Sequence, residues 1–261
     1  ENAPAIKMEH RGKMYDKMYC DVIENNRPLS EEYLDSFKEL LDFFTAKSKI
    51  QYELLYYKDF QEIPFVRRTL IRIIRQREKF LPFIAPTERR LRIRFPCPTC
   101  KFAEKTAIEV VIKPIKDRKG YTLHSYCNHH GAHSTKLLEN NNDFIDFNTS
   151  IRNVIKEAKF IEDAKENNAL NLMIDGGDWV GMANQVGHSL DLLGYRYRDM
   201  ALRIFTPIIE DWSGAKFSKS IYVQSNTYKL LPESLVSYIN FKSEYGNKGM
   251  EAIWAEVKEW G

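Results

Sequence analysis

Three of the four cysteines in the chain, together with one nearby histidine, have the spacing of metal ligands. Cys97 and Cys100 form one pair separated by two residues, and Cys127 and His130 form a second pair with the same gap. Two such pairs, bridged by a β-hairpin, are the usual source of four tetrahedral nitrogen and sulfur ligands. No position is left open for a substrate, so we predict a structural Zn²⁺ site.

The fourth ligand and the state of the cysteines have alternatives. His130 is preferred because it repeats the two-residue gap, but His129 and His133 could replace it. Three buried free cysteines are the other interpretation, which leaves their spacing unexplained. Bound metal would supply folding free energy to a small β-ribbon with little core. Cys20 lies outside the pattern and is expected to be a buried, unreactive thiol. So few cysteines favour a reducing, cytoplasmic setting.

A second group of residues suited to chemistry is the segment Lys216-Phe217-Ser218-Lys219-Ser220, in a glycine-containing turn after an expected strand. Two ammonium groups in one short loop can bracket a polyphosphate and offset charge at its α-phosphate. Gly176-Gly177-Asp178 forms a glycine-rich turn directly after another expected strand. The alternatives are an ordinary solvated loop for the first segment, and helix N-capping by Asp175 or Asp178 for the second.

The elements expected around these motifs alternate between helices and strands. Apolar residues at helical spacing indicate helices, and short alternating or continuous apolar runs indicate strands. The expected helices cover 30–44, 64–80, 151–164 and 180–193, with a helical tail beyond Pro232 that is broken at 245–249. The expected strands cover 92–95, 107–115, 121–126, 170–174 and 203–209, with 50–57 as a further strand or an extended buried segment.

Several local signals support these assignments. Ser30 is the expected N-cap of the first helix, and Pro82 and Pro86 are expected to end the second. The run 170–174 is typical of a buried parallel strand. The order strand, glycine-rich turn, helix, strand between 170 and 209 predicts a parallel α/β unit.

The composition is that of an ordinary soluble globular protein, with 43% hydrophobic and 29% charged residues in 261. A net charge of +3 neither requires nor excludes a nucleic-acid partner. No run of about 18 apolar residues occurs, so no membrane span is expected. Basic residues are concentrated in one stretch, interpreted as a solvated helix face or as a phosphate-facing surface. They are Arg67, Arg68, Arg72, Arg75, Arg77, Lys79, Arg89, Arg90, Arg92 and Arg94.

The order of these motifs resembles the class I aminoacyl-tRNA synthetases, and most of all the archaeal-type class I lysyl-tRNA synthetase. Lys216 to Ser220 is similar to the KMSKS loop of that class, with Phe217 in place of methionine. The resemblance covers roughly residues 30 to 225. The other matching residues are Cys97-Pro98-Thr99-Cys100, Tyr126-Cys127 with Gly131, Lys136-Leu137 and Gly176-Gly177-Asp178.

The resemblance implies an α/β fold: a Rossmann-like class I synthetase catalytic core with an inserted zinc ribbon and a helical C-terminal tail. It implies activation of an amino acid, with lysine favoured, by ATP and Mg²⁺, and transfer to tRNA in the cytoplasm. Lys219 and Lys216 would be catalytic, and ATP would be bound by Gly176, Gly177, Asp178, Ser218 and Lys219. The expected segments are 1–92, mainly helical core; 93–135, zinc ribbon; 136–222, second half of the nucleotide-binding domain; and 223–261, helical tail.

The chain also departs from the family's pattern. The HIGH motif is absent, since no apolar strand precedes His10-Arg11-Gly12-Lys13, and Trp179 stands where the family usually has histidine. The sequence after the KxSKS segment is too short for an anticodon-binding domain. We therefore expect either the C-terminal part of a catalytic core or a paralogue that does not read anticodons. The alternative functions are a non-catalytic RNA-binding or regulatory module, and a zinc-ribbon interaction protein.

Overall fold

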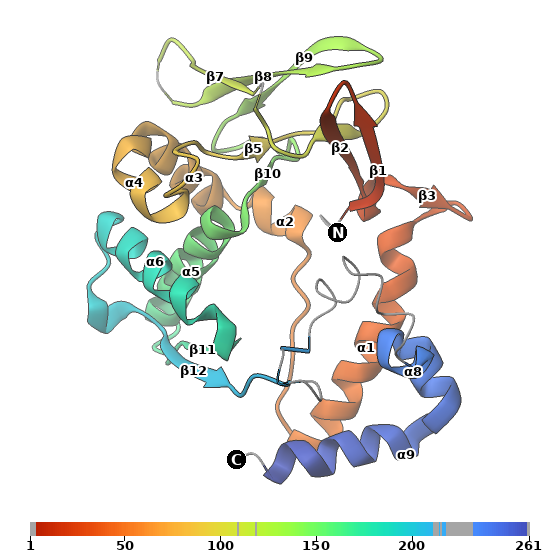
Figure 1. The fold of residues 1–261 in the computed structure, drawn as a ribbon. Helices are drawn as coiled ribbons and strands as arrows, with labels where there is room; N and C mark the ends of the chain where they lie inside the picture. Colours follow the sequence, from red (N-terminus) through yellow and green to blue (C-terminus); the bar gives the residue numbers. More distant parts are fainter. Residues whose placement is uncertain are drawn as a thin grey trace. The chain divides into compact units, whose positions relative to one another are not determined.

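The chain is mixed α/β with small sheets, and its short strands and helices follow one another largely in groups (Figure 1). The computed structural model describes residues 4–108, 110–117, 119–210, 214, 216–217 and 232–259. The chain divides into two compact units. Unit 1 consists of Glu1–Glu32 and Tyr52–Thr206, and unit 2 consists of Tyr33–Gln51 and Pro207–Gly261. The four segments expected from the sequence stay a prediction.

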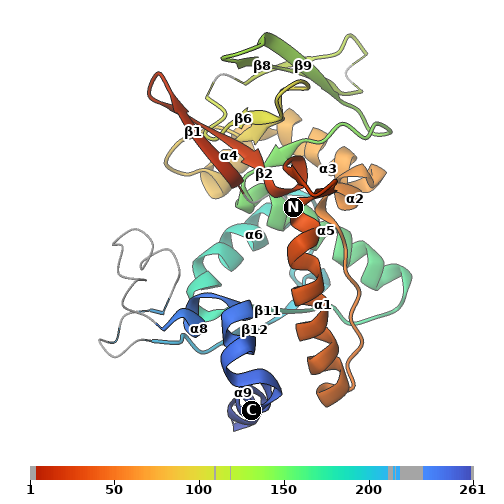
Figure 2. The same cartoon turned by 90° about the vertical axis from the view of Figure 1, so that its right-hand side faces the viewer.

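Unit 1 begins with an antiparallel sheet that the sequence did not indicate. Its strands are β1 (Pro4–His10), β2 (Lys13–Met18) and β6 (Phe102–Glu104), in the order β1-β2-β6 (Figure 2). Arg11 and Gly12 close the β1–β2 hairpin with φ angles of 49° and 72°. A 3-10 turn (Tyr19–Asp21) and a two-residue hairpin of β3 (Ile23–Glu24) and β4 (Arg27–Pro28) follow.

A second antiparallel sheet contains β7 (Val111–Pro114), β8 (Tyr121–Cys127) and β9 (Gly131–Leu137). The expected hairpin around residue 120 is confirmed by the β7–β8 pairing, whereas β9 was not predicted. Leu123 on β8 and Leu137 on β9 are fully buried and join the hydrophobic core of the unit.

The core of unit 1 is formed by this sheet, by helix α6 (Val180–Leu192) and by four earlier helices. These are α2 (Tyr57–Glu62), α3 (Pro64–Arg75), α4 (Arg77–Ile84) and α5 (Thr149–Glu166), and the short strands β5 (Ile93–Arg94) and β10 (Asp146–Phe147) pair beside them. The expectation of one helix ended by Pro82 was wrong. Gln76, with φ −108° and ψ 22°, separates α3 from α4, and Pro82 lies inside α4. Pro82 has no N–H, which removes one intrahelical hydrogen bond, and α4 ends two residues later at Ile84.

The expected parallel unit is present. Strand β11 (Leu172–Gly176), a 3-10 turn (Gly177–Trp179), helix α6 (Val180–Leu192), a second 3-10 turn (Tyr197–Asp199) and strand β12 (Leu202–Thr206) follow one another. The strands pair in parallel, from Leu172 with Leu202 to Gly176 with Thr206.

The prediction that β11 is a buried strand was wrong for one of its faces. The side chains of Leu172 and Ile174 are 46% and 63% exposed, and their β12 partners Leu202 and Ile204 are 57% and 52% exposed. A parallel sheet normally has both faces covered. Here only the face that carries Met173 and Arg203 turns toward the interior, where it borders a cavity shared with α5 and α6.

Unit 2 is mainly helical in its described part. It contains most of α1 (Leu29–Ser48), with α8 (Glu233–Val236) and α9 (Tyr238–Glu259). Lys47 on α1 forms an ion pair with Glu251 on α9 at 2.6 Å, and the rings of Phe44 and Trp254 lie 6.0 Å apart. The expected break in the tail is confirmed at Gly246, whose φ of 54° kinks α9.

Two details of the first helix and the segment after it differ from expectation. Helix α1 begins at Leu29, so Ser30 is not its N-cap but its second residue. Residues 50–56 form no strand, and Ile50 and Leu55 are 72% and 51% exposed, so the interpretation as a strand or buried segment was wrong. No described helix has the length and hydrophobicity needed to cross a membrane.

Candidate metal centre

The first ligand pair lies in the turn between β5 and β6. The N–H of Cys97 donates to the carbonyl of Phe102, and the N–H of Lys101 donates to the carbonyl of Cys97, each at 2.9 Å. Lys101 has a φ of 66°, which lets the chain reverse around the sulfur of Cys97. Cys100 lies within this turn, so both thiols are directed by the same local backbone fold.

The second pair lies at the turn between β8 and β9. Cys127 is the last residue of β8 and pairs with Gly131, the first residue of β9, whose φ is 76°. His130 is therefore the last residue of a tight turn that returns the chain to the sheet. The hydroxyl of Tyr15 on β2 donates to Asn128 Oδ1 at 3.2 Å, which ties this turn to the first sheet.

The four predicted ligand atoms meet in one place. Cys100 Sγ lies 3.5 Å from Cys127 Sγ, and His130 Nδ1 lies 3.6 Å from the sulfurs of Cys97 and Cys127. All four ligand atoms are within 4.8 Å of one another. Bonds of about 2.3 Å in tetrahedral geometry place two sulfur ligands about 3.8 Å apart. The cluster therefore has the dimensions of a tetrahedral site that could hold a metal ion.

The thiols of the cluster differ in their electrostatic environment. Burial opposes ionisation of Cys97, but the N–H groups of Cys100 and Thr99 donate to its sulfur and lower its pKa. Burial raises the pKa of the Cys100 thiol to about 11. The sulfurs at 3.5 Å are too far apart for a disulfide bond, and all four cysteines are free. The half-buried Cys20 lies outside the cluster.

The competing histidines have other surroundings. His133 Nδ1 lies 3.5 Å from the carbonyl oxygen of Gly131, and its ring packs edge-on against Phe95 with centroids 5.1 Å apart. Burial lowers the pKa of His133. The ring of His129 lies between those of His10 and His130, at centroid distances of 6.5 and 6.3 Å. Among the described residues, the cluster includes His130 and neither alternative.

A buried ion-pair network lies between the first sheet and the helices of unit 1. Arg94 on β5 donates to Asp16 on β2 and to Asp146 on β10, each at 2.8 Å, and Arg152 on α5 donates to Asp146 at 3.3 Å. Burial alone would lower the pKa of Arg94, but Asp146 and Asp16 outweigh it and raise the pKa. Asp16 and Asp146 are 1% and 2% exposed.

Two arginines of the basic stretch are therefore interior residues. Besides Arg94, Arg67 is 2% exposed and donates to Asn141 Oδ1 at 2.9 Å and to the carbonyl of Asp143 at 2.7 Å. Neither of the two surface interpretations of the stretch applies to them. The sequence shows the charges but not their partners, which lie 52 to 78 residues away.

The expected nucleotide-binding turn follows β11 directly. Gly176 ends the strand, and Gly177 and Asp178 begin the 3-10 turn before α6. Trp179 is the N-cap residue of α6 and makes no side-chain capping bond, so neither nearby aspartate is that cap. Asp175 instead pairs with Arg203 on β12 at 2.9 Å, and Arg203 also pairs with Glu157 on α5.

The KxSKS segment is described only at its start. Lys216 pairs with Glu210 in an antiparallel bridge, and the N–H of Phe217 donates to the carbonyl of Ile209 at 2.8 Å. Ser218, Lys219 and Ser220 lie outside the described residues. The proposed phosphate contacts of this segment stay predictions.

Comparison of the chain with known protein families, with curated proteins and with solved structures gave no match. Two features of this chain bear on its function. One is the cluster of Cys97, Cys100, Cys127 and His130, and the other is the parallel unit from β11 to β12.

Proposed function

We propose that this protein activates an amino acid with ATP and transfers it to tRNA, as class I aminoacyl-tRNA synthetases do, with lysine as the favoured amino acid. The observation that carries the proposal is the parallel unit β11–α6–β12, with its glycine-rich turn. The metal-binding cluster, which precedes this unit in the chain, adds the second part of the motif order. Such an enzyme would work in the cytoplasm.

The geometry of the parallel unit suits a nucleotide site at one edge. Gly176 pairs with Thr206, so the chain leaves β11 and β12 at the same edge of the sheet. This carboxyl edge is where α/β sheets bind their ligands. A Cβ on Gly176 would lie 2.8 Å from Asp178 Oδ1, so a larger residue there would displace the Asp178 side chain. In the proposal, Asp178 binds the ribose or orients the nucleotide, and Gly176 and Gly177 let it approach the backbone.

The KxSKS segment follows β12 in the chain and supplies the charge for catalysis in this proposal. Lys219 contacts the ATP phosphates and offsets negative charge that develops at the α-phosphate. Lys216 and Ser218 support the loop. Mg²⁺ accompanies the ATP phosphates, because it prefers oxygen ligands.

The metal that we propose for the cysteine cluster is zinc in a structural role. Three thiolates and one imidazole nitrogen are a common ligand set of structural zinc sites, and soft sulfur ligands disfavour Mg²⁺. Four protein ligands complete a tetrahedron, so no coordination position remains for a reacting molecule. The zinc would hold the turn before β6 against the β8–β9 turn, and the chemistry would take place elsewhere.

Amino-acid-dependent exchange of pyrophosphate into ATP tests the proposal in the full-length protein. We expect exchange with lysine, and a loss of about a hundredfold or more in Lys219→Ala, because one charged stabilising group is removed. Zinc content should be unchanged in that variant. Lys258→Ala, at an exposed position on α9, is the matched control and should keep full activity.

Two outcomes would contradict the proposal. If Lys219→Ala exchanges pyrophosphate like the wild type, the role of the KxSKS segment is wrong. If no amino acid supports exchange while tRNA is still bound, the protein is a non-catalytic RNA-binding relative of the synthetases. The exposed arginines of α3 favour that second candidate.

A further inference from the structure

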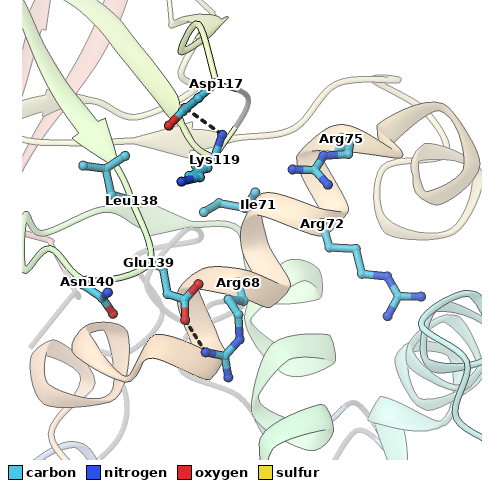
Figure 3. Close-up of a pocket in the computed structure, with 9 residues that line it drawn as sticks. All are labelled: Arg68, Ile71, Arg72, Arg75, Asp117, Lys119, Leu138, Glu139 and Asn140. Carbon is cyan, nitrogen blue, oxygen red and sulfur yellow. Dashed lines mark hydrogen bonds and ion pairs between the residues drawn. The ribbon is translucent and has the colours of Figure 1, made fainter.

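A cavity of about 580 Å³ lies in unit 1, between helix α3 and the turn that joins β7 to β8 (Figure 3). Its volume is within the range of small-molecule sites. The helix contributes residues one and two turns apart, and the segment after β9 closes another side. The residues used below are Arg68, Ile71, Arg75, Lys119, Leu138 and Glu139.

The cavity carries an excess of positive charge. Among the described residues that line it, three arginines of α3 and Lys119 give four cations, against two carboxylates from Asp117 and Glu139, so the difference is 4 − 2 = +2. Arg68 pairs with Glu139. Asp117 Oδ1 accepts a hydrogen bond from the backbone N–H of Lys119 at 3.0 Å, which shapes the turn. A cavity of this charge favours an anion over a cation or a neutral ligand.

The floor of the cavity is apolar. Ile71 is 6% exposed and belongs to the hydrophobic core, and the half-buried Leu138 lies on the opposite wall. In Figure 3 the Arg68–Glu139 pair and the side chains of Arg75 and Lys119 surround Ile71. An apolar floor inside a ring of charges suits a ligand with one flat apolar group and one anionic group.

Contacts within the fold hold the two sides of the cavity that carry the cations. A Cβ on Gly120 would lie 2.3 Å from the carbonyl oxygen of Leu137, so the backbone beside Lys119 is packed against the end of β9. On the other side, Arg72 donates from Nη1 to the carbonyl of Leu193 at 3.0 Å. Its guanidinium keeps further N–H donors for a ligand.

A smaller cavity of about 180 Å³ continues past the same arginines. Arg68 and Arg72 line both cavities, and the second also has Phe65 and Tyr195 in its wall. Lys165 lies over the Tyr195 ring, 5.0 Å from its centroid. Aromatic rings beside arginines provide stacking surfaces for bases in nucleic-acid grooves. A ligand longer than one nucleotide therefore has a path beyond the first cavity.

We infer that the cavity on α3 binds a nucleotide, with its phosphate between Arg75 and Lys119 and its base or sugar on Ile71 and Leu138. A free nucleoside monophosphate and the phosphorylated end of an RNA strand offer the same chemistry. The site shares no residue with the proposed ATP site and does not depend on synthetase activity.

Calorimetric titration of the full-length protein tests this site with three probes: AMP, adenosine, and a 5′-phosphorylated RNA pentanucleotide. We expect AMP to bind at least about tenfold more tightly than adenosine, because charged hydrogen bonds to the phosphate are lost in adenosine. The double variant Arg75→Gln/Lys119→Gln should weaken AMP binding by about tenfold or more. Lys219→Ala should leave it unchanged, which separates this site from the proposed ATP site.

The matched control is Arg77→Gln/Lys79→Gln, which removes two exposed cations of the neighbouring helix α4 outside the cavity. It should change AMP affinity less than twofold. Lys119→Glu, on an exposed turn, is a second test that reverses one charge without changing the helix. If the pentanucleotide binds more tightly than AMP, and the same variants remove this binding, an RNA end is the ligand. Equal AMP affinity in wild type and both cavity variants, or no binding of either phosphorylated probe, would overturn the inference.

Discussion

Glu157 on α5 is a buried carboxylate with charged groups of both signs near it. Its side chain is 3% exposed and pairs with Arg203, while Oε2 is buried without a hydrogen-bond partner. Lys156 and Asp175 are the other charged groups that act on it. Burial is the largest influence and raises the pKa of Glu157, although Arg203 and Lys156 act in the opposite direction. This carboxylate therefore binds its proton more tightly in the folded protein than in the unfolded chain.

The raised pKa predicts how stability depends on pH. Because the folded state keeps this proton to higher pH, the contribution of Glu157 decreases as pH rises from about 4.3 through the raised value. Glu157→Gln removes this effect and keeps an acceptor for Arg203. The unfolding free energy of wild type minus that of the variant should therefore fall with rising pH. The fall is about 1.4 kcal/mol for each factor of ten by which folding tightens proton binding at Glu157.

Urea unfolding between pH 4 and pH 8 measures this difference. Glu166→Gln, at the exposed end of the same helix, is the control and should give a difference that does not change with pH. A constant difference for Glu157→Gln as well would show that burial does not govern the ionisation of this carboxylate.

At the scale of elements, the β7–β8 turn depends on a residue without a side chain. A Cβ on Gly120 would lie 2.3 Å from the carbonyl oxygen of Leu137 and 2.7 Å from Leu138 Cδ2. Backbone atoms of a paired strand cannot move aside without breaking the ladder, so Gly120→Ala should force β8 and β9 apart at this end. We expect a loss of about 1–3 kcal/mol in unfolding free energy.

Thermal and urea unfolding check this prediction. Gly187→Ala in α6 is the matched control, because nothing lies within 4 Å of its added Cβ. Removing a glycine from a helix interior should stabilise the protein by up to about 1 kcal/mol. If Gly120→Ala leaves the unfolding free energy unchanged or raises it, the close approach at Gly120 does not constrain the sheet.

The elements that could be predicted are those with local signals. The helix of α5 is marked by apolar spacing and by Asn148, whose side chain accepts from the N–H of Ile151 at 3.0 Å. Strand β9 was missed because its alternating pattern has polar residues on the exposed side and only Leu137 fully buried. The apolar composition of 50–57 predicted burial, but composition does not report what covers a segment.

The candidate sites also differ in how far the sequence alone predicts them. Cys97, Cys100, Cys127 and His130 could be identified because each pair lies within one turn, so spacing along the chain reports spacing in space. Only part of the cavity on α3 could be predicted from the sequence. Its arginines recur along the helix, but Lys119 and Glu139 come from distant segments. No pattern in the sequence predicts that Asp16 is buried, because its burial depends on pairing with Arg94.

At the scale of the whole molecule, all four members of the cluster of Cys97, Cys100, Cys127 and His130 belong to unit 1. They connect the turn between β5 and β6 with the turn between β8 and β9, while unit 2 has its own contacts between α1 and α9. If a metal ion supplies folding free energy at this cluster, its removal should affect the two units unequally.

Hydrogen exchange of backbone amides, with and without a chelator, measures this difference. We expect chelation to speed exchange in β6, β8 and β9, because their turns lose a shared anchor and open locally. Amides of α9 should exchange at an unchanged rate. Cys97→Ser should reproduce the pattern without chelator and lower the bound zinc, whereas Cys20→Ser, outside the cluster, should do neither.

Faster exchange in α9 to the same extent would mean that metal removal unfolds the chain as one body. Unchanged exchange in β8 and β9 would mean that these turns hold together without the ion, and the cluster would then not be a structural zinc site.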